Sequence, residues 1–152
     1  MHTELRTLIF QAEEDYLQEA DLDKFKVKVS TLADRLTVYE IIRENEVLLF
    51  QSIVDRLMQD KVDRDPKIVE RAISNWISIL RYCSMAMLLN DTEYLQSRLL
   101  EWLTEQVKAH QLQAIGTEIY QMLQARLKKL VSAEQFALFL PFLEEAKKTL
   151  LS

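Results

Sequence analysis

The chain has 152 residues, of which 49% are hydrophobic and 28% charged, a composition typical of a soluble globular protein rather than a disordered one. A chain of this length suits a single domain over residues 1–152 and buries roughly two-thirds of its unfolded surface. The formal net charge of −5 argues against non-specific binding of nucleic acid, which requires clustered Lys and Arg.

The residues that break helices are scarce, with one Gly and two Pro in the whole chain, so we expect long helices joined by short links. The single cysteine, Cys83, has no partner for an intrachain disulfide, which fits a reducing compartment. No signal sequence or membrane span is predicted, because the apolar run 77–89 is short and contains Ser78, Arg81 and Ser84. We therefore expect an all-α protein in the cytoplasm.

Two helices are predicted at the N-terminus, one over residues 3–17 and one that begins near Asp21, which can cap it. Helical periodicity then continues over residues 31–59. Ser30-Thr31 can start a new helix there, but no Gly or Pro indicates whether this region holds one helix or two.

Each N-terminal helix carries its own apolar stripe. The stripes either fold back on the body of the protein or pack against a partner chain, and the pattern does not decide between these alternatives. The candidate interface residues are Leu5, Leu8, Ile9, Tyr16, Leu22 and Phe25.

The central helix is predicted to begin at Asp65-Pro66 and to end at Leu89. Asp65 is a good N-cap, and Pro66 suits the first helical position. The helix is apolar on nearly all faces, which is typical of a helix buried among others, and Cys83 on it is expected to be a small buried hydrophobe.

Three further helices are expected after the central one. Asn90 with Glu93 has the capping-box pattern and predicts a helix start, whereas Gly116 predicts a turn. Ser132 is expected to cap the last helix, in which Pro141 should remove one hydrogen bond and produce a kink.

No motif for catalysis is found. The chain lacks a Gly-rich phosphate loop, Cys/His metal spacing and a nucleophile elbow, and its two histidines, His2 and His110, exclude a multi-His metal site. We therefore expect neither an enzyme nor a metal site. His110 alone is a candidate haem ligand, although a position beside Gln111 at a helix end favours an exposed side chain.

Several segments resemble phycobiliprotein subunits: Ala12-Glu13-x-x-Tyr16-Leu17, Leu22-Asp23-x-x-Lys26, Arg35-Leu36, Gln51-x-x-x-Asp55-x-Leu57-x-Gln59 and Tyr82-Cys83. The resemblance implies a globin-like helical body over residues 31–152, preceded by two extra helices over residues 1–30. In that family the extra helices join subunits into dimers, which favours the partner-facing alternative.

The chain departs from the family at the pigment site. The family attaches a linear tetrapyrrole, or bilin, to a cysteine near the start of the central helix, and Val69 stands at that position. The family Arg-Asp pair becomes Arg71-Ala72, and the residues of the cross-subunit salt bridge fall at Gln11 and Ser78. The resemblance therefore implies a colourless relative, similar to the bilin-biosynthesis-associated globins.

On this basis we expect a non-enzymatic, phycobilisome-related accessory protein that acts in bilin metabolism or phycobilisome assembly. It would bind a protein partner, as a homodimer or heterodimer, or transiently a free tetrapyrrole. By position, Val69, Ile73 and Trp76 would line that pocket and Arg71 would meet a propionate. A haem globin that uses His110 as sensor or carrier, and a structural adaptor with a dry core, are the alternatives.

Overall fold

The structure is a computed structural model that describes residues 3–59 and 64–152, and the regular elements in these ranges are all helical. In chain order they are α1 (Thr3–Glu14), α2 (Glu19–Gln59), α3 (Pro66–Leu89), α4 (Thr92–Leu95), the π-helical turn η1 (Gln96–Leu100), α5 (Glu101–Ala109), α6 (Gln113–Leu130) and α7 (Ala133–Leu150). The predicted all-α fold class is confirmed.

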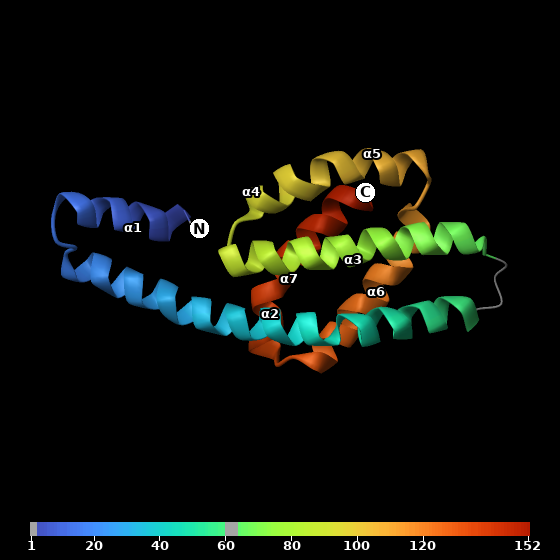
Figure 1. Ribbon diagram of the computed structural model, residues 1–152, viewed down its shortest axis with the longest axis horizontal. Helices are drawn as coiled ribbons and strands as arrows, with labels where there is room; N and C mark the ends of the chain where they lie inside the picture. The colour runs from blue at the N-terminus through green and yellow to red at the C-terminus, as the bar shows by residue number, and fades with distance from the viewer. Residues whose placement is uncertain (1–2, 60–63) are drawn as a thin grey trace.

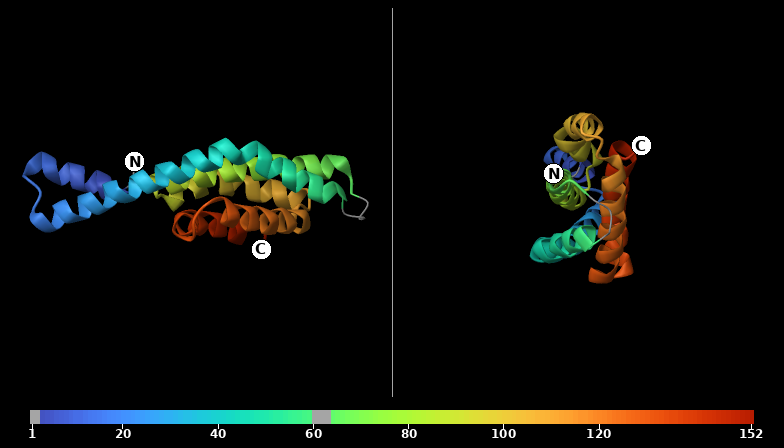
Figure 2. Two further views of the ribbon diagram at one scale, coloured as in Figure 1. Left: turned by 90° about the horizontal axis from the view of Figure 1, so that it is seen from below. Right: turned by 90° about the vertical axis from the view of Figure 1, so that its right-hand side faces the viewer.

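The molecule consists of a helical body and a projecting hairpin (Figure 1). The second half of α2 packs in the body together with α3 to α7, whereas its first half extends beyond the body and α1 folds back along it. The left view of Figure 2 shows the same arm at one end of the molecule. α3 lies at the centre of the body, where it contacts α2, α4, α6 and α7.

The helix predicted to begin near Asp21 and the region 31–59, for which the sequence left one helix or two open, form one continuous helix, α2, of 41 residues. The hydroxyl of Thr31 donates a hydrogen bond to the carbonyl of Lys28 in the preceding turn, at 3.0 Å, which is a bond typical of Thr inside a helix. Thr31 therefore does not start a new helix. Asp21 lies in the first turn of α2 and is not its cap. The first helix ends at Glu14, earlier than predicted.

The start of α3 is as predicted. The carboxylate of Asp65 accepts a hydrogen bond from the backbone N–H of Lys67 at 3.0 Å, and Pro66 occupies the first turn. One side of α3 supplies much of the core of the body. Its buried residues are Val69, Ala72, Ile73, Trp76, Ile79, Leu80, Cys83, Ser84, Ala86 and Met87.

The expected capping box at Asn90 is wrong. Asn90 ends α3 in the left-handed region with φ 51°, a conformation that Asn tolerates because its short polar side chain bonds locally. Asp91 is the N-cap of α4 instead, and its carboxylate accepts from the N–H groups of Glu93 and Tyr94.

The predicted turn at Gly116 is also wrong, because Gly116 lies inside α6. The chain turns at His110-Gln111, where Gln111 has φ 53°. The glycine lies where an added side chain would meet close neighbours. A Cβ at this position would lie 2.8 Å from Cδ2 of Leu151 and 3.3 Å from Nε1 of Trp76.

The last helix begins at the predicted cap. Ser132 and Gln135 form a reciprocal capping box, in which each side chain accepts from the other's backbone N–H. Pro141 lies within α7 on its exposed side, and α7 continues past it to Leu150. The proline therefore does not end the helix.

Of the described helices, α3 alone has the length and composition of a membrane span, and 50% of its apolar stretch is buried inside the body. A core helix meets the same criterion, and the contacts of α3 with four other helices are those of a core helix.

Candidate functional site

A largely apolar hollow of about 430 Å³ lies between α2 and α3. Val69 and Ile73 contribute to its wall from the buried side of α3, with 4% and 9% of their surfaces exposed. The complete lining is Val54, Met58, Pro66, Val69, Glu70, Ile73, Ser74 and Ile77. Because no Lys or Arg is among these residues, the hollow suits an apolar ligand better than the carboxylate of a propionate.

The other two predicted pocket residues lie elsewhere. Trp76 is buried against the ring of Tyr120, with the ring centroids 6.0 Å apart. Arg71 is exposed, and its Nη1 lies 2.6 Å from Nδ1 of His110. The structure therefore brings Val69 and Ile73 together, but places Trp76 in the core and Arg71 outside the hollow.

His110 is exposed at the end of α5. A guanidinium only donates hydrogen bonds, so Nδ1 of His110 must accept from Arg71. The hollows described here do not include His110 in their walls. This geometry gives the haem alternative no support. His2 lies outside the described residues.

The predicted interface residues divide into two groups. Leu8 is buried, and Leu5 and Phe25 are half-buried. The other three side chains face solvent, with 38% of Ile9, 93% of Tyr16 and 44% of Leu22 exposed.

Sequence reasoning missed Phe10, which is 54% exposed on α1 and lies under the guanidinium of Arg6. The large aromatic side chain beside Ile9 was the signal that could have identified it. A second hollow, of about 660 Å³, lies between α1 and α2, where Lys28 and Glu4 form an ion pair. The inner side of the hairpin is thus hollowed between α1 and α2.

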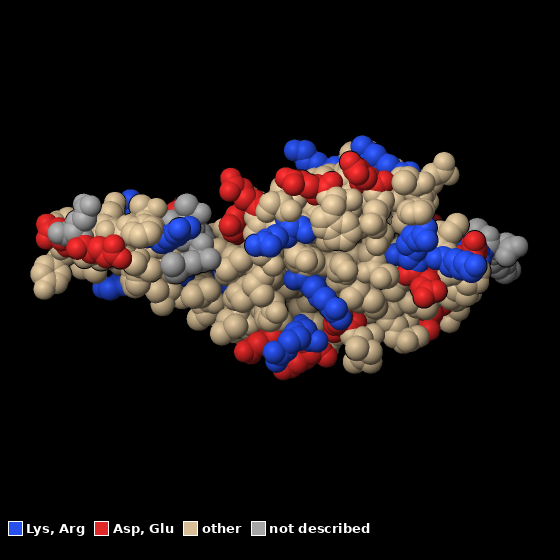
Figure 3. Space-filling view, turned by 45° about the horizontal axis from the view of Figure 1, so that its top comes forward, with Lys and Arg blue, Asp and Glu red and all other residues tan. Residues whose placement is uncertain are grey.

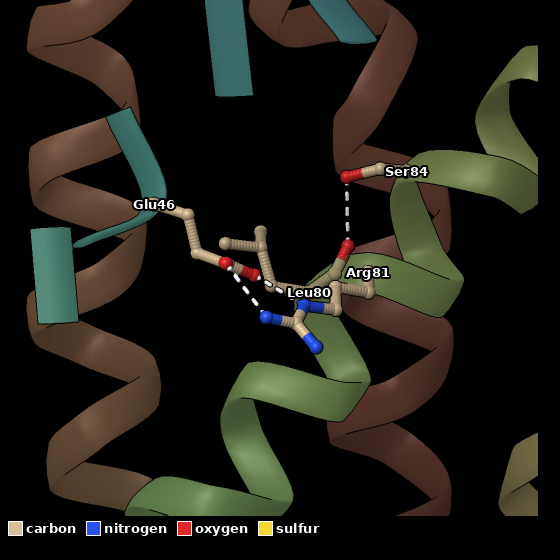
Figure 4. A network of polar contacts seen from close by, with 4 residues as sticks. All are labelled: Glu46, Leu80, Arg81 and Ser84. Atoms are coloured by element: carbon tan, nitrogen blue, oxygen red, sulfur yellow. Dashed lines mark hydrogen bonds and ion pairs between the residues drawn. The ribbon is translucent and has the colours of Figure 1, made fainter. Parts of the chain in front are cut away.

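Polar contacts fix α2 on α3 (Figure 4). Arg81 donates twice to the carboxylate of Glu46, at 2.7 and 3.0 Å, and this hydrogen-bonded charge raises the pKa of Arg81. Nearer the hairpin, Nη1 of Arg35 donates to the carbonyl of Met87 at 2.7 Å, and burial lowers the pKa of Arg35. Polar contacts therefore link α2 to α3 at two places along α3.

The single cysteine is confirmed as a buried residue. Cys83 is fully buried, its thiol donates to the carbonyl of Phe142 at 3.5 Å, and burial raises its pKa. A thiol kept protonated in the core is not a nucleophile. Within residues 3–59 and 64–152, no group of three or more His, Cys, Asp or Glu is placed to hold a metal ion.

Charges of both signs are interspersed on the face shown in Figure 3, with no extended basic patch on that face. This distribution agrees with the acidic composition. A phosphate backbone would require a basic stripe, so this face offers no nucleic-acid site.

The comparison with known families identifies the chain. Residues 8–150 match the family described as "Phycobilisome protein". The protein belongs to the phycobilisome protein family. The match runs from α1 to the last residue of α7 and so includes both the hairpin and the body. No curated protein matches the chain.

Members of the phycobilisome protein family normally bind covalent bilins, assemble into oligomers and are generally non-enzymatic pigment proteins. A phycobilisome-related role for this protein follows from its membership. The family also accounts for the expected globin-like helical fold with two additional N-terminal helical segments.

Proposed function

We propose that this phycobilisome protein is a non-enzymatic, cytoplasmic accessory protein that binds a partner through its α1–α2 hairpin. Its role would lie in phycobilisome assembly or bilin metabolism. The observation that carries this proposal is the projection of the hairpin from the body with Ile9, Phe10, Tyr16 and Leu22 exposed. Burial of such side chains against a partner is favourable by roughly 25 cal/mol per Å² of apolar surface.

We also propose that the whole chain, residues 1–152, acts as one domain. The boundary proposed between the helical pair at 1–30 and the globin-like body at 31–152 falls inside α2, which is continuous there. A partner bound to the hairpin is thereby joined to the body through one continuous helix.

The absence of a covalent bilin is part of the proposal. Val69 has no sulfur, and the only cysteine of the chain, Cys83, is fully buried and bonded to the carbonyl of Phe142. A thioether needs an accessible thiolate, and burial raises the pKa of this thiol. Both observations support a colourless protein.

The partner proposal is tested by titrating the protein into immobilised apo forms of phycobiliprotein α and β subunits. The Phe10→Glu variant places a charge on the exposed side of α1 and should weaken binding by about tenfold or more, because a charge at an interface core is unpaired. Gln121→Glu, on the exposed side of α6, adds the same charge to the body and is the control. Equal affinity of the two variants, or no binding by the unmodified protein, would refute the proposal.

The apolar hollow between α2 and α3 is the basis of a second candidate function, transient binding of the apolar part of a free bilin. Met58→Glu at its half-exposed rim should weaken a bilin-induced absorbance change, whereas Arg71→Ala should leave it unchanged because Arg71 contacts His110 instead. The lack of any saturable change with bilin would refute this function. A haem Soret band that disappears in His110→Ala would establish the haem alternative in its place.

A further inference from the structure

An open hollow of about 300 Å³ lies on the body between α2 and α6, apart from the hairpin and from the hollow between α2 and α3. We call it the α2–α6 groove. Its complete lining in the described part of the chain is Asn45, Leu48, Leu49, Ser52, Arg126, Lys129 and Leu130. Two cations therefore lie beside three leucines, and this lining contains no Asp or Glu.

The two cations of the groove have no counter-charge. Nε of Arg126 donates to the hydroxyl of Ser52 at 2.8 Å, which leaves the donors of its two Nη groups for a ligand. Neither Arg126 nor Lys129 forms an ion pair within residues 3–59 and 64–152. The helix dipole accounts for Lys129 in the last turn of α6, but not for Arg126, which comes before that turn. The pair is left uncompensated in a chain whose net charge is −5.

The apolar side of the groove is open to solvent as well. Leu48 is 71% exposed and its neighbour Val47 is 77% exposed, whereas Leu49 belongs to the core. Exposed apolar side chains that are rimmed by charged ones are typical of a surface that binds another protein. The groove thus offers a partner both apolar area to cover and two positive charges to pair.

The spacing of the two cations matches that of acidic residues on a helix. Arg126 and Lys129 are three residues apart on α6, so their Cβ atoms are about 5–6 Å apart. Carboxylates one turn apart on a partner helix have the same separation, and a carboxylate accepts two hydrogen bonds from one guanidinium. An amphipathic helix is also the usual occupant of an apolar groove, because its side chains at intervals of three and four enter it together.

We propose that the α2–α6 groove binds an amphipathic acidic helix of a partner protein. The apolar stripe of that helix covers Leu48 and Leu130, and two of its carboxylates, one turn apart, pair with Arg126 and Lys129. A basic or uncharged helix leaves both cations unpaired at the interface, so the groove discriminates against it. This surface is separate from the hairpin, and the proposal goes beyond the function proposed for the hairpin and does not depend on it.

The test is fluorescence anisotropy of a labelled helical peptide of about 18 residues, with Leu at intervals of three and four and Glu on both flanks of that stripe. The unmodified protein should bind it saturably, and a peptide with Gln in place of every Glu should bind about tenfold more weakly. Lys129→Glu should raise the Kd by about fivefold or more. Lys108→Glu, exposed on α5, makes the same charge change away from the groove and should have no effect. Leu48→Gln removes exposed apolar area and should also weaken binding.

Amide NMR spectra locate the bound peptide, and circular dichroism verifies that each variant is folded. The shifts should be confined to residues 45–52 and 126–130. No saturable binding, equal Kd values for the two peptides, or equal effects of Lys129→Glu and Lys108→Glu would overturn the proposal. Shifts over α1 and the start of α2 would place the peptide on the hairpin and overturn it too. The same shifts with sodium acetate alone, at the peptide's concentration, would make the groove a site for small carboxylates instead.

Discussion

Replacement of Gly116 by alanine tests the close packing between α6, Trp76 and the end of the chain. The added Cβ would lie 2.8 Å from Cδ2 of Leu151 and 3.3 Å from Nε1 of Trp76. Trp76 is 3% exposed and packed on Tyr120, so its ring has little room to move. Overpacking of a core costs about 1–3 kcal/mol.

The same substitution also has a favourable effect. Alanine is better than glycine inside a helix by about 1 kcal/mol, because glycine loses more backbone freedom on folding. We therefore expect Gly116→Ala to lower the free energy of unfolding by about 0–2 kcal/mol, and not to raise it.

Urea unfolding followed by tryptophan fluorescence measures this change. Ala125→Gly, at an exposed position of α6, gives the helix-propensity difference in the same helix without a packing contribution. Leu151→Ala in the Gly116→Ala background removes the closest contact and should recover part of the loss. A Gly116→Ala protein more stable by the full value lost in Ala125→Gly would refute the packing argument.

Two further predictions concern Cys83 and Asp65. Because burial raises the pKa of Cys83, the unfolded chain loses this proton above about pH 8.5 while the native protein keeps it. The free energy of unfolding should therefore fall as the pH rises above that value, by up to about 1.4 kcal/mol per pH unit. In urea titrations over this pH range, the difference in free energy of unfolding between the unmodified protein and Cys83→Ala should shrink. A difference that does not change with pH would contradict a raised pKa for the buried thiol. Asp65→Ala removes the side-chain acceptor for the N–H of Lys67 and should cost about 1 kcal/mol in the same assay, whereas Asp65→Asn should cost much less.

The parts of the fold that could be predicted are those encoded by neighbouring residues. Asp65 with Pro66, and Ser132 with Gln135, specify helix starts through contacts within four residues, and both starts were found. Asn90 and Asp91 are both good caps, and the sequence pattern favours Asn90 as the N-cap, whereas Asn90 is the left-handed end of α3 and Asp91 caps α4. A pattern of caps cannot distinguish two adjacent candidates of similar chemistry.

The errors at Gly116 and in the pocket have a different cause, which is contact between residues far apart in sequence. The sequence around Gly116 predicts a turn because its neighbours do not reveal that Trp76 approaches it from another helix. Val69, Ile73 and Trp76 share one broad face of α3, but α2 bounds a hollow along one edge of that face while α6 covers Trp76. Whether a neighbouring helix covers a given part of this face or leaves a hollow beside it depends on helix packing. The periodicity of the sequence does not encode that packing.

The continuity of α2 has a consequence for how the arm folds. A helix of 41 residues is about 60 Å long, and only its second half is anchored by the core. Starting a helix is unfavourable, whereas adding residues to an existing one is not, so the arm is propagated from the turns that the core already holds in place. The first half of α2 therefore has no nucleation step of its own. Its order should decline gradually from Val38 toward Glu19, as a gradient of amide protection along one rod rather than a boundary between two parts.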